Sequence, residues 1–176
     1  MDKILNLFIK EPVREFHVRE VAKLTDKSPT TVSKYLSALE KKKFLVSQRK
    51  FRHLFFRADA DSPVFRDRKL CVNIAALRAS GLFDFLETEF RHPQCIVLFG
   101  SWRKAENIPR SDIDLLIVTP VKKDVSLGSF EKRLGSSIQL FVHSPGEINR
   151  LREKNKDLVN NWVNGIVLSG FWELLS

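Results

Sequence analysis

Apolar residues recur at the three- and four-residue spacing of an α-helix in three segments near the start of the chain. The first two segments are short and each ends in a break in the pattern, so they predict two short helices. The third is the clearest, because Ser28 is a favourable N-cap residue and Pro29 suits the first helical position. The apolar positions are Leu5, Phe8 and Ile9; Val18, Val21 and Ala22; and Val32, Tyr35, Leu36 and Leu39.

Two strand-like runs follow these helices. FLVSQRK and HLFFRAD predict a β-hairpin around a basic turn, with Arg49, Lys50 and Arg52 near its tip. Residues 61–90 return to an apolar helical pattern that is interrupted near Gly81, which predicts one or two helices.

The last part of the chain again contains strand-like runs. CIVLF, LLIV and SSIQLFVHS predict three short strands, and SPGEINRLREKN predicts a helix that begins at Ser144 and Pro145. The pattern therefore predicts an α+β protein. The expected domains are residues 1–60, a helical connector at 61–90, and residues 91–176.

Positive charge is concentrated in the first part of the chain. Residues 1–68 hold sixteen of the 30 Lys and Arg but nine of the 21 Asp and Glu. Between Lys27 and Arg57 there are nine basic residues and one acid, Glu40. Such a surplus is typical of a surface that faces a polyanion, although a basic run is also common on a solvated face.

The apolar runs, the first segment and the two cysteines bear on where the protein is found in the cell. No apolar run approaches the length of a membrane span, and the first segment is charged throughout, without the apolar region of a signal peptide. We therefore expect a cytoplasmic protein without a membrane partner. Cys71 and Cys95 are each flanked by apolar residues, which predicts two buried free thiols.

The segment HVREVAKLTDKSPTTVSKYLSALEKKKFLVSQRK resembles the winged helix-turn-helix family of transcriptional regulators. The resemblance implies that a recognition helix, Ser28 to Lys43, enters the major groove of double-stranded DNA, and that the hairpin contacts the backbone or the minor groove. The motif also serves in protein contacts, and the basic surface favours DNA. The expected DNA-binding residues are Ser28, Thr30, Thr31, Lys34, Arg49, Lys50 and Arg52.

Two carboxylates stand at the start of the LLIV strand. Asp112 and Asp114 would point to one face, because side chains alternate along a strand, while Ile113 and Leu115 would point into the core. Adjacent carboxylates repel, and a divalent cation such as Mg²⁺ or Mn²⁺ would relieve that repulsion. The alternative is a surface loop with a chance Asp-x-Asp.

The longer string VLFGSWRKAENIPRSDIDLLIV resembles the signature of the DNA polymerase β nucleotidyltransferase superfamily, particularly its minimal nucleotidyltransferases. In that signature Gly-Ser is followed, after ten residues, by Asp-x-Asp. The resemblance implies a small mixed-sheet nucleotidyltransferase fold in which Gly100 and Ser101 hold a triphosphate, and Asp112 and Asp114 are catalytic metal ligands. The further nucleotide contacts it suggests are Arg103, Lys104 and Ser111, the last of which also caps the turn into the strand.

The resemblance also implies a third carboxylate on a later strand, which two-metal transfer uses, and this sequence departs from the family at that position. The corresponding strand is SSIQLFVHS, where Gln139 occupies the expected position and cannot act as a base near neutral pH. Glu131 and Glu147 flank this strand and would substitute only if their loops bend back. His143 is another candidate base, although a lone His near a strand end is more often structural.

Two hypotheses follow. In the first, the protein binds DNA and transfers a nucleoside monophosphate from an NTP to an unknown acceptor, with Mg²⁺ or Mn²⁺ as cofactor. In the second, it is a transcriptional regulator whose degenerate nucleotidyltransferase domain only binds nucleotide. A resemblance to minimal nucleotidyltransferase antitoxins adds a partner protein as an acceptor to be tested, and a regulator of this kind is compatible with a homodimer.

Overall fold

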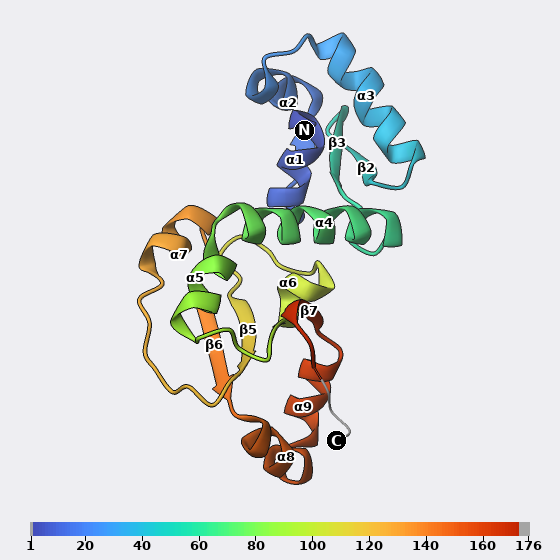
Figure 1. The fold of residues 1–176 in the computed structure, drawn as a ribbon. Helices are drawn as coiled ribbons and strands as arrows, with labels where there is room; N and C mark the ends of the chain where they lie inside the picture. Colours follow the sequence, from blue (N-terminus) through green and yellow to red (C-terminus); the bar gives the residue numbers. More distant parts are fainter. Residues whose placement is uncertain (1, 173–176) are drawn as a thin grey trace. The chain divides into compact units, whose positions relative to one another are not determined.

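The computed structural model describes residues 2–172 and divides the chain into two compact units, Met1–Lys69 and Leu70–Ser176 (Figure 1). The boundary falls within helix α4 (Pro63–Ala79), and α5 (Leu82–Glu89) follows it. The predicted interruption is present, because Gly81 between the two helices has a left-handed φ of +76°. Both units combine helices with a sheet, so the predicted α+β class is confirmed. None of the described helices is long and apolar enough to cross a membrane.

The first unit contains the three predicted helices, α1 (Lys3–Lys10), α2 (Val18–Thr25) and α3 (Pro29–Lys41). Helix α3 begins as the sequence predicts: the hydroxyl of Ser28 accepts a hydrogen bond from the amide of Thr31 at 3.2 Å. The apolar side chains of α3 at Val32, Leu36 and Leu39 are buried.

Tyr35 departs from this pattern. It has the spacing of the buried residues of α3, yet it is 38% exposed and its hydroxyl donates a hydrogen bond to Asp2. That bond, followed by partial burial, raises the pKa of the phenol to about 12. Tyr35 therefore lies at the edge of the core, where its hydroxyl can donate a hydrogen bond to a polar partner.

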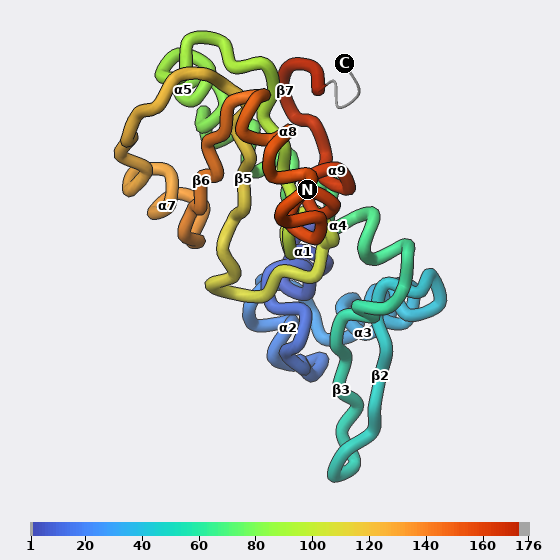
Figure 2. The backbone as a smooth tube through the Cα atoms, turned by 90° about the horizontal axis from the view of Figure 1, so that it is seen from below, coloured from blue at the N-terminus to red at the C-terminus, as the bar shows by residue number. Residues whose placement is uncertain are grey.

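A β-hairpin completes the first unit. Strands β2 (Leu45–Lys50) and β3 (His53–Ala58) pair antiparallel, and the short β1 (Phe16–His17), which the sequence pattern did not predict, pairs with β3. Figure 2 shows the hairpin extending beyond α2 and α3. The helices and the hairpin agree with the sequence pattern, and the winged helix-turn-helix interpretation stays a prediction.

The second unit is built on a four-stranded mixed sheet. Its strands are β4 (Cys95–Phe99), β5 (Ile113–Val118), β6 (Ile138–His143) and β7 (Ile166–Gly170), in the order β6-β5-β4-β7. Strand β5 runs antiparallel to β4 and parallel to β6. In this register Asp114 lies between Phe99 on β4 and Gln139 on β6.

Two hydrophobic cores lie on opposite faces of this sheet. On one face, Ile113 and Leu115 pack with residues of α5 and α7 (Gly128–Leu134). On the other face, Leu116 packs with residues of α8 (Pro145–Lys154) and α9 (Lys156–Val163), including the fully buried Trp162. Because side chains alternate along β5, Asp112 and Asp114 belong to the α8–α9 face, beyond the end of its hydrophobic core.

The prediction of two buried thiols is half wrong. Cys95 is fully buried in β4, and burial raises the pKa of its thiol to about 11. Cys71 is exposed on α4. In a strand that is packed on both faces, a residue with apolar neighbours is buried together with them. On a helix, the residues before and after a position point in other directions, so their apolar character does not predict its burial.

The packing of α3 gives a test of the first unit. We expect Leu36→Ala, which removes a fully buried side chain, to lower the free energy of unfolding by about 2–5 kcal/mol. Leu24→Ala is the matched control, because Leu24 is 54% exposed and its truncation should change stability by no more than about 0.5 kcal/mol. Urea unfolding of the full chain measures both, and equal effects would contradict the assigned core.

Candidate nucleotide site and basic groove

The turn after β4 brings the backbone against a carboxylate. Gly100 has φ +68°, and a Cβ atom at this position would lie 2.1 Å from Oδ2 of Asp114. No larger residue fits without moving that carboxylate. Gly100 and Ser101 also begin the short helix α6 (Gly100–Lys104), so the predicted Gly-Ser pair is a strand-to-helix turn that adjoins Asp114.

The ten residues between Ser101 and Asp112 contain the rest of α6 and a second turn. Trp102 is buried, and its indole nitrogen donates to the carbonyl of Ser111 at 3.3 Å. The hydroxyl of Ser111 accepts from the amide of Ile108 at 2.9 Å, which agrees with its predicted role in the turn. Ala105 ends α6 in the left-handed region at φ +58°, a conformation that glycine adopts more easily. These ten residues thus connect the end of β4 to the start of β5.

Asp112 and Asp114 meet Gln139 on one face of the sheet. The side-chain amide of Gln139 donates a hydrogen bond to Oδ2 of Asp112 at 2.9 Å. Burial, and then the charge of Asp112, raise the pKa of Asp114. The position predicted for a third carboxylate therefore holds an amide, which donates one hydrogen bond to the carboxylate of Asp112.

The two aspartates fit a divalent cation only in part. Both are hard oxygen ligands, and the pKa of Asp114 is raised first by burial and then by the charge of Asp112. Among residues 2–172, no group of three or more His, Cys, Asp or Glu side chains is arranged to hold a metal ion. Asp112 and Asp114 would thus hold a cation that takes its other ligands from water or from phosphate oxygens, as Mg²⁺ commonly does.

The other candidate acids are turned away from this face. The carbonyl of Ser137 accepts from Ile113 on β5, so the next amide, that of Ile138, points to the opposite edge of β6. Glu131 accepts that amide at 2.9 Å and so lies on the far side of β6 from Asp114. Glu131 does not supply the missing carboxylate in this arrangement.

Glu147 and His143 lie at the other end of β6. His143 is four residues beyond Gln139, or about 13 Å along the strand. Its ring packs on Trp162 with a centroid distance of 5.1 Å, and burial lowers its pKa. Glu147 caps α8 and pairs with Lys122 at 2.6 Å, which holds its pKa at about 2. Both residues have structural partners, as expected for His143.

The predicted phosphate contacts differ in their surroundings. Lys104 is exposed at the end of α6. Arg103 is half-buried, and its Nε atom is buried without a hydrogen-bond partner among the described residues. A buried N–H without an acceptor is unfavourable, so an anion beside α6 would supply Arg103 with a partner.

Residues 80–165 match the family described as nucleotidyltransferase domain. The match includes the Gly100 turn, both aspartates and Gln139, and it supports a nucleotidyl-transfer role for this part of the chain. Searches of curated proteins and of solved structures found no match. The family match thus lies within the second unit, and it does not extend to the first.

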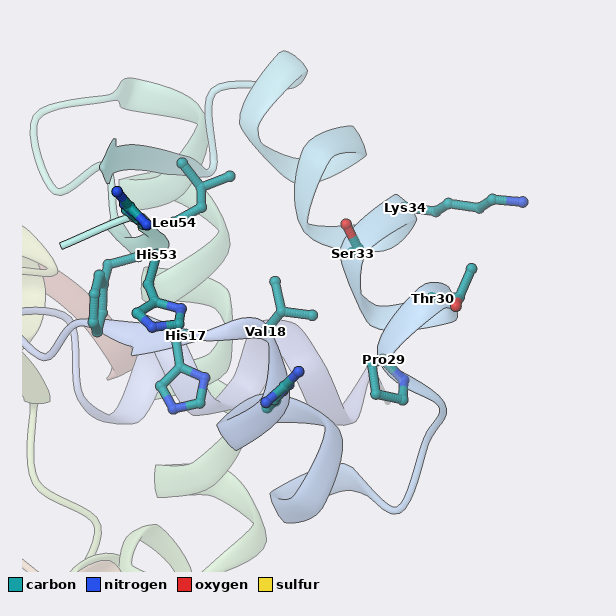
Figure 3. A pocket seen from close by; sticks show the side chains of 11 residues that line it. His17, Val18, Pro29, Thr30, Ser33, Lys34, His53 and Leu54 are labelled. Carbon is teal, nitrogen blue, oxygen red and sulfur yellow. The ribbon is translucent and has the colours of Figure 1, made fainter. Parts of the chain in front are cut away.

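A basic groove of about 820 Å³ lies within the first unit. Figure 3 shows that its side chains come from the start of α2, the start of α3 and β3. Its charged lining residues are Arg19, Lys34 and Arg52, together with His17 and His53, and no Asp or Glu is among the described residues that line it. The groove is therefore suited to a negatively charged backbone.

Three of the predicted DNA-binding residues, Thr30, Lys34 and Arg52, line this groove. Ser28 and Thr31 are exposed, and their hydroxyls share a 2.8 Å hydrogen bond at the start of α3. The remaining two predicted residues belong to the hairpin: Arg49 is exposed, and Lys50 pairs with Glu15 at 2.6 Å.

Sequence reasoning missed Arg19, His17 and His53. In the sequence, only their positive or polar character marks them. The groove forms when α2, α3 and β3 pack together, and local spacing does not predict that packing.

Gly100 gives a direct test of the turn. We expect Gly100→Ala to abolish most binding of ATP with Mg²⁺, because the added Cβ must displace the Asp114 carboxylate. Gly135→Ala is the matched control: Gly135 has φ +70°, so alanine there has the same backbone cost, about 1–2 kcal/mol, but nothing lies within 4 Å of its Cβ position. Calorimetry measures both, and equal affinity of the two variants would remove Asp114 from the site.

Proposed function

We propose that the second unit binds a nucleoside triphosphate with Mg²⁺ and transfers its nucleoside monophosphate to an acceptor hydroxyl. The observation that carries this proposal is the packing of Gly100 against Asp114, beside Asp112, inside the part of the chain that matches nucleotidyltransferase domains. A side chain at position 100 would displace the Asp114 carboxylate, which in this proposal holds the cation.

In this proposal the residues of the turn contact the phosphates, and the aspartates at the start of β5 hold the cation. The backbone of Gly100 and the hydroxyl of Ser101 approach the triphosphate, while Arg103 and Lys104 neutralise its charge. Ser111 keeps the turn before β5 in place through its bond to Ile108. A Mg²⁺ ion held by Asp112 and Asp114 would supply charge neutralisation on the phosphates.

The transfer itself joins the acceptor oxygen to the α-phosphorus. The bond from this phosphorus to the oxygen that bridges it to the β-phosphate breaks, and pyrophosphate leaves. The acceptor hydroxyl must also lose a proton, and Gln139 has no basic atom that takes it near neutral pH. Without a carboxylate at this position the proton passes to solvent, so we expect slow transfer.

The alternative function is nucleotide sensing without transfer. The hydrogen bond from Gln139 to Asp112 favours it, because this amide occupies one acceptor oxygen of a proposed metal ligand and adds no charge for a second cation. In that case nucleotide binding would serve regulation, and no acceptor would be labelled.

For the first unit we propose a winged helix-turn-helix that binds double-stranded DNA. The support is chemical: a groove at the start of α3, the proposed recognition helix, is lined by Arg19, Lys34 and Arg52, and none of its described lining residues is acidic. Lysine and arginine neutralise phosphates, while Thr30 at the groove wall has a hydroxyl suited to a phosphate or a base edge.

Position 139 separates the two candidate functions of the second unit. Gln139→Asp places a carboxylate on β6 next to Asp114, and a general base typically contributes about 10²- to 10⁴-fold in rate. We expect Gln139→Asp to transfer label from NTP to a protein or nucleic-acid acceptor pool faster than the natural protein. Gln139→Asn is the control, since it has the same length as the aspartate without its charge. Fast transfer by the natural protein would show that another group takes the proton.

DNA binding is tested at the hairpin. We expect replacement of Arg49, Lys50 and Arg52 by Ala to weaken duplex binding and to lower the slope of log K against log salt by about one unit per lost phosphate contact. Lys50 should contribute least, because Glu15 already pairs with it. Replacement of Lys132, Lys154 and Lys156, all exposed in the second unit, removes the same charge and should leave the slope nearly unchanged. Equal effects of the two triple variants would contradict the hairpin assignment.

A further inference from the structure

The tip of the β2–β3 hairpin has an unusual pair of residues. Lys50 pairs with His53, so Phe51 and Arg52 alone form the turn. Their φ angles are +46° and +66°, which is the left-handed conformation of a type I′ turn. Asn-Gly is the favoured sequence for such a turn, and a bulky aromatic residue with positive φ is rare. The fold therefore accommodates Phe51 at a position where Asn would be more stable.

The Phe51 ring gains no packing energy in return. It is 95% exposed, more than any other large hydrophobic side chain among the described residues; the next are Phe171 at 69% and Val13 at 68%. A single exposed apolar residue is ordinary on a protein surface. An exposed ring combined with an unfavourable backbone conformation at a projecting tip points to a function outside the fold (Figure 2).

The charges around Phe51 indicate the partner. Arg49, Lys50, Arg52 and His53 all lie within two residues of the ring, and Glu15 faces Lys50 from outside the hairpin. An acidic protein surface would match the charges but not the lone ring, and a narrow tip of two residues offers little area for a protein interface. Duplex DNA matches both features, because phosphates flank a minor groove whose base steps accept an inserted apolar side chain.

We propose that Phe51 inserts as a wedge between two base pairs of duplex DNA from the minor groove and partly unstacks that step. Arg49 and Arg52 then neutralise phosphates on either side of it. The proposal rests on the proposed DNA binding of the first unit. Insertion should be easiest at pyrimidine–purine steps such as TA, which unstack most readily.

The probe is an alternating TA duplex that carries 2-aminopurine in place of some adenines, so that every register of binding presents a suitable step. The fluorescence of 2-aminopurine rises when the base loses its stacking. At low salt and saturating full-length protein we expect a rise with the natural sequence and with Phe51→Leu, which retains an apolar wedge. Phe51→Ala should give no rise and should bind about 5- to 150-fold more weakly, if insertion is worth as much as base–aromatic stacking.

Salt dependence separates the wedge from the charges. Phe51→Ala should leave the slope of log K against log salt unchanged, whereas Arg52→Ala should lower it by about one unit and still unstack the duplex at saturation. Phe51→Asn should also abolish the rise in fluorescence without lowering the midpoint of thermal unfolding, since Asn suits the turn. Loss of stability in that variant would instead assign Phe51 a structural role and overturn the proposal.

The remaining outcomes distinguish this inference from the function beneath it. If the natural protein binds no duplex, the proposed DNA binding fails and the wedge fails with it. If the natural protein binds but Phe51→Ala gives the same fluorescence and affinity, DNA binding stands and the wedge is overturned. Tighter binding of the single strand than of the duplex, lost in Phe51→Ala, would replace insertion by stacking on unpaired bases.

Discussion

The antiparallel pairing of β4 with β5 sets Phe99 opposite Asp114, and it leaves no room for a side chain on the next residue, Gly100. This close approach imposes two requirements on Gly100. The strand must end in a turn with positive φ, and the turn must expose backbone beside a half-buried carboxylate. The buried Trp102 and the bond from Ile108 to Ser111 then return the chain to β5, so α6 and the following turn depend on the same junction.

The sequence predicted the parts of the fold that local chemistry determines. Ser28 and Pro29 start α3, and Ser144 and Pro145 start α8, because a cap depends on residues only three positions apart; the capping box of Ser144 with Glu147 was not predicted. Alternation within β5 likewise predicted that Asp112 and Asp114 share a face, since Ile113 and Leu115 have to be buried. The position of Gln139 beside them was predicted through the family resemblance, and the parallel register of β5 and β6 agrees with it.

What the sequence could not predict depends on packing between distant segments. The two-residue strand β1 exists only because β3 offers it an edge, and the groove walls at His17, Pro29 and His53 meet only after α2, α3 and β3 have packed. Tyr35 has the spacing of a core residue, but it is partly exposed, and the distant Asp2 accepts a hydrogen bond from its hydroxyl. Lys50 was predicted from charge alone, and its pairing with Glu15, 35 positions away, changes how much of that charge is available.

Gln139 also has a consequence for the stability of the proposed nucleotide site. Burial first, and then the charge of Asp112, raise the pKa of Asp114, and the amide of Gln139 donates a hydrogen bond to Asp112. A carboxylate at position 139 would add a third negative charge to the same face and would need a second cation to balance it. An amide would therefore suit the proposed site, which would bind one cation together with a nucleotide. In the proposed site, a cation at Oδ2 of Asp112 would have to release or share this hydrogen bond, which would couple nucleotide binding to the position of the Gln139 side chain.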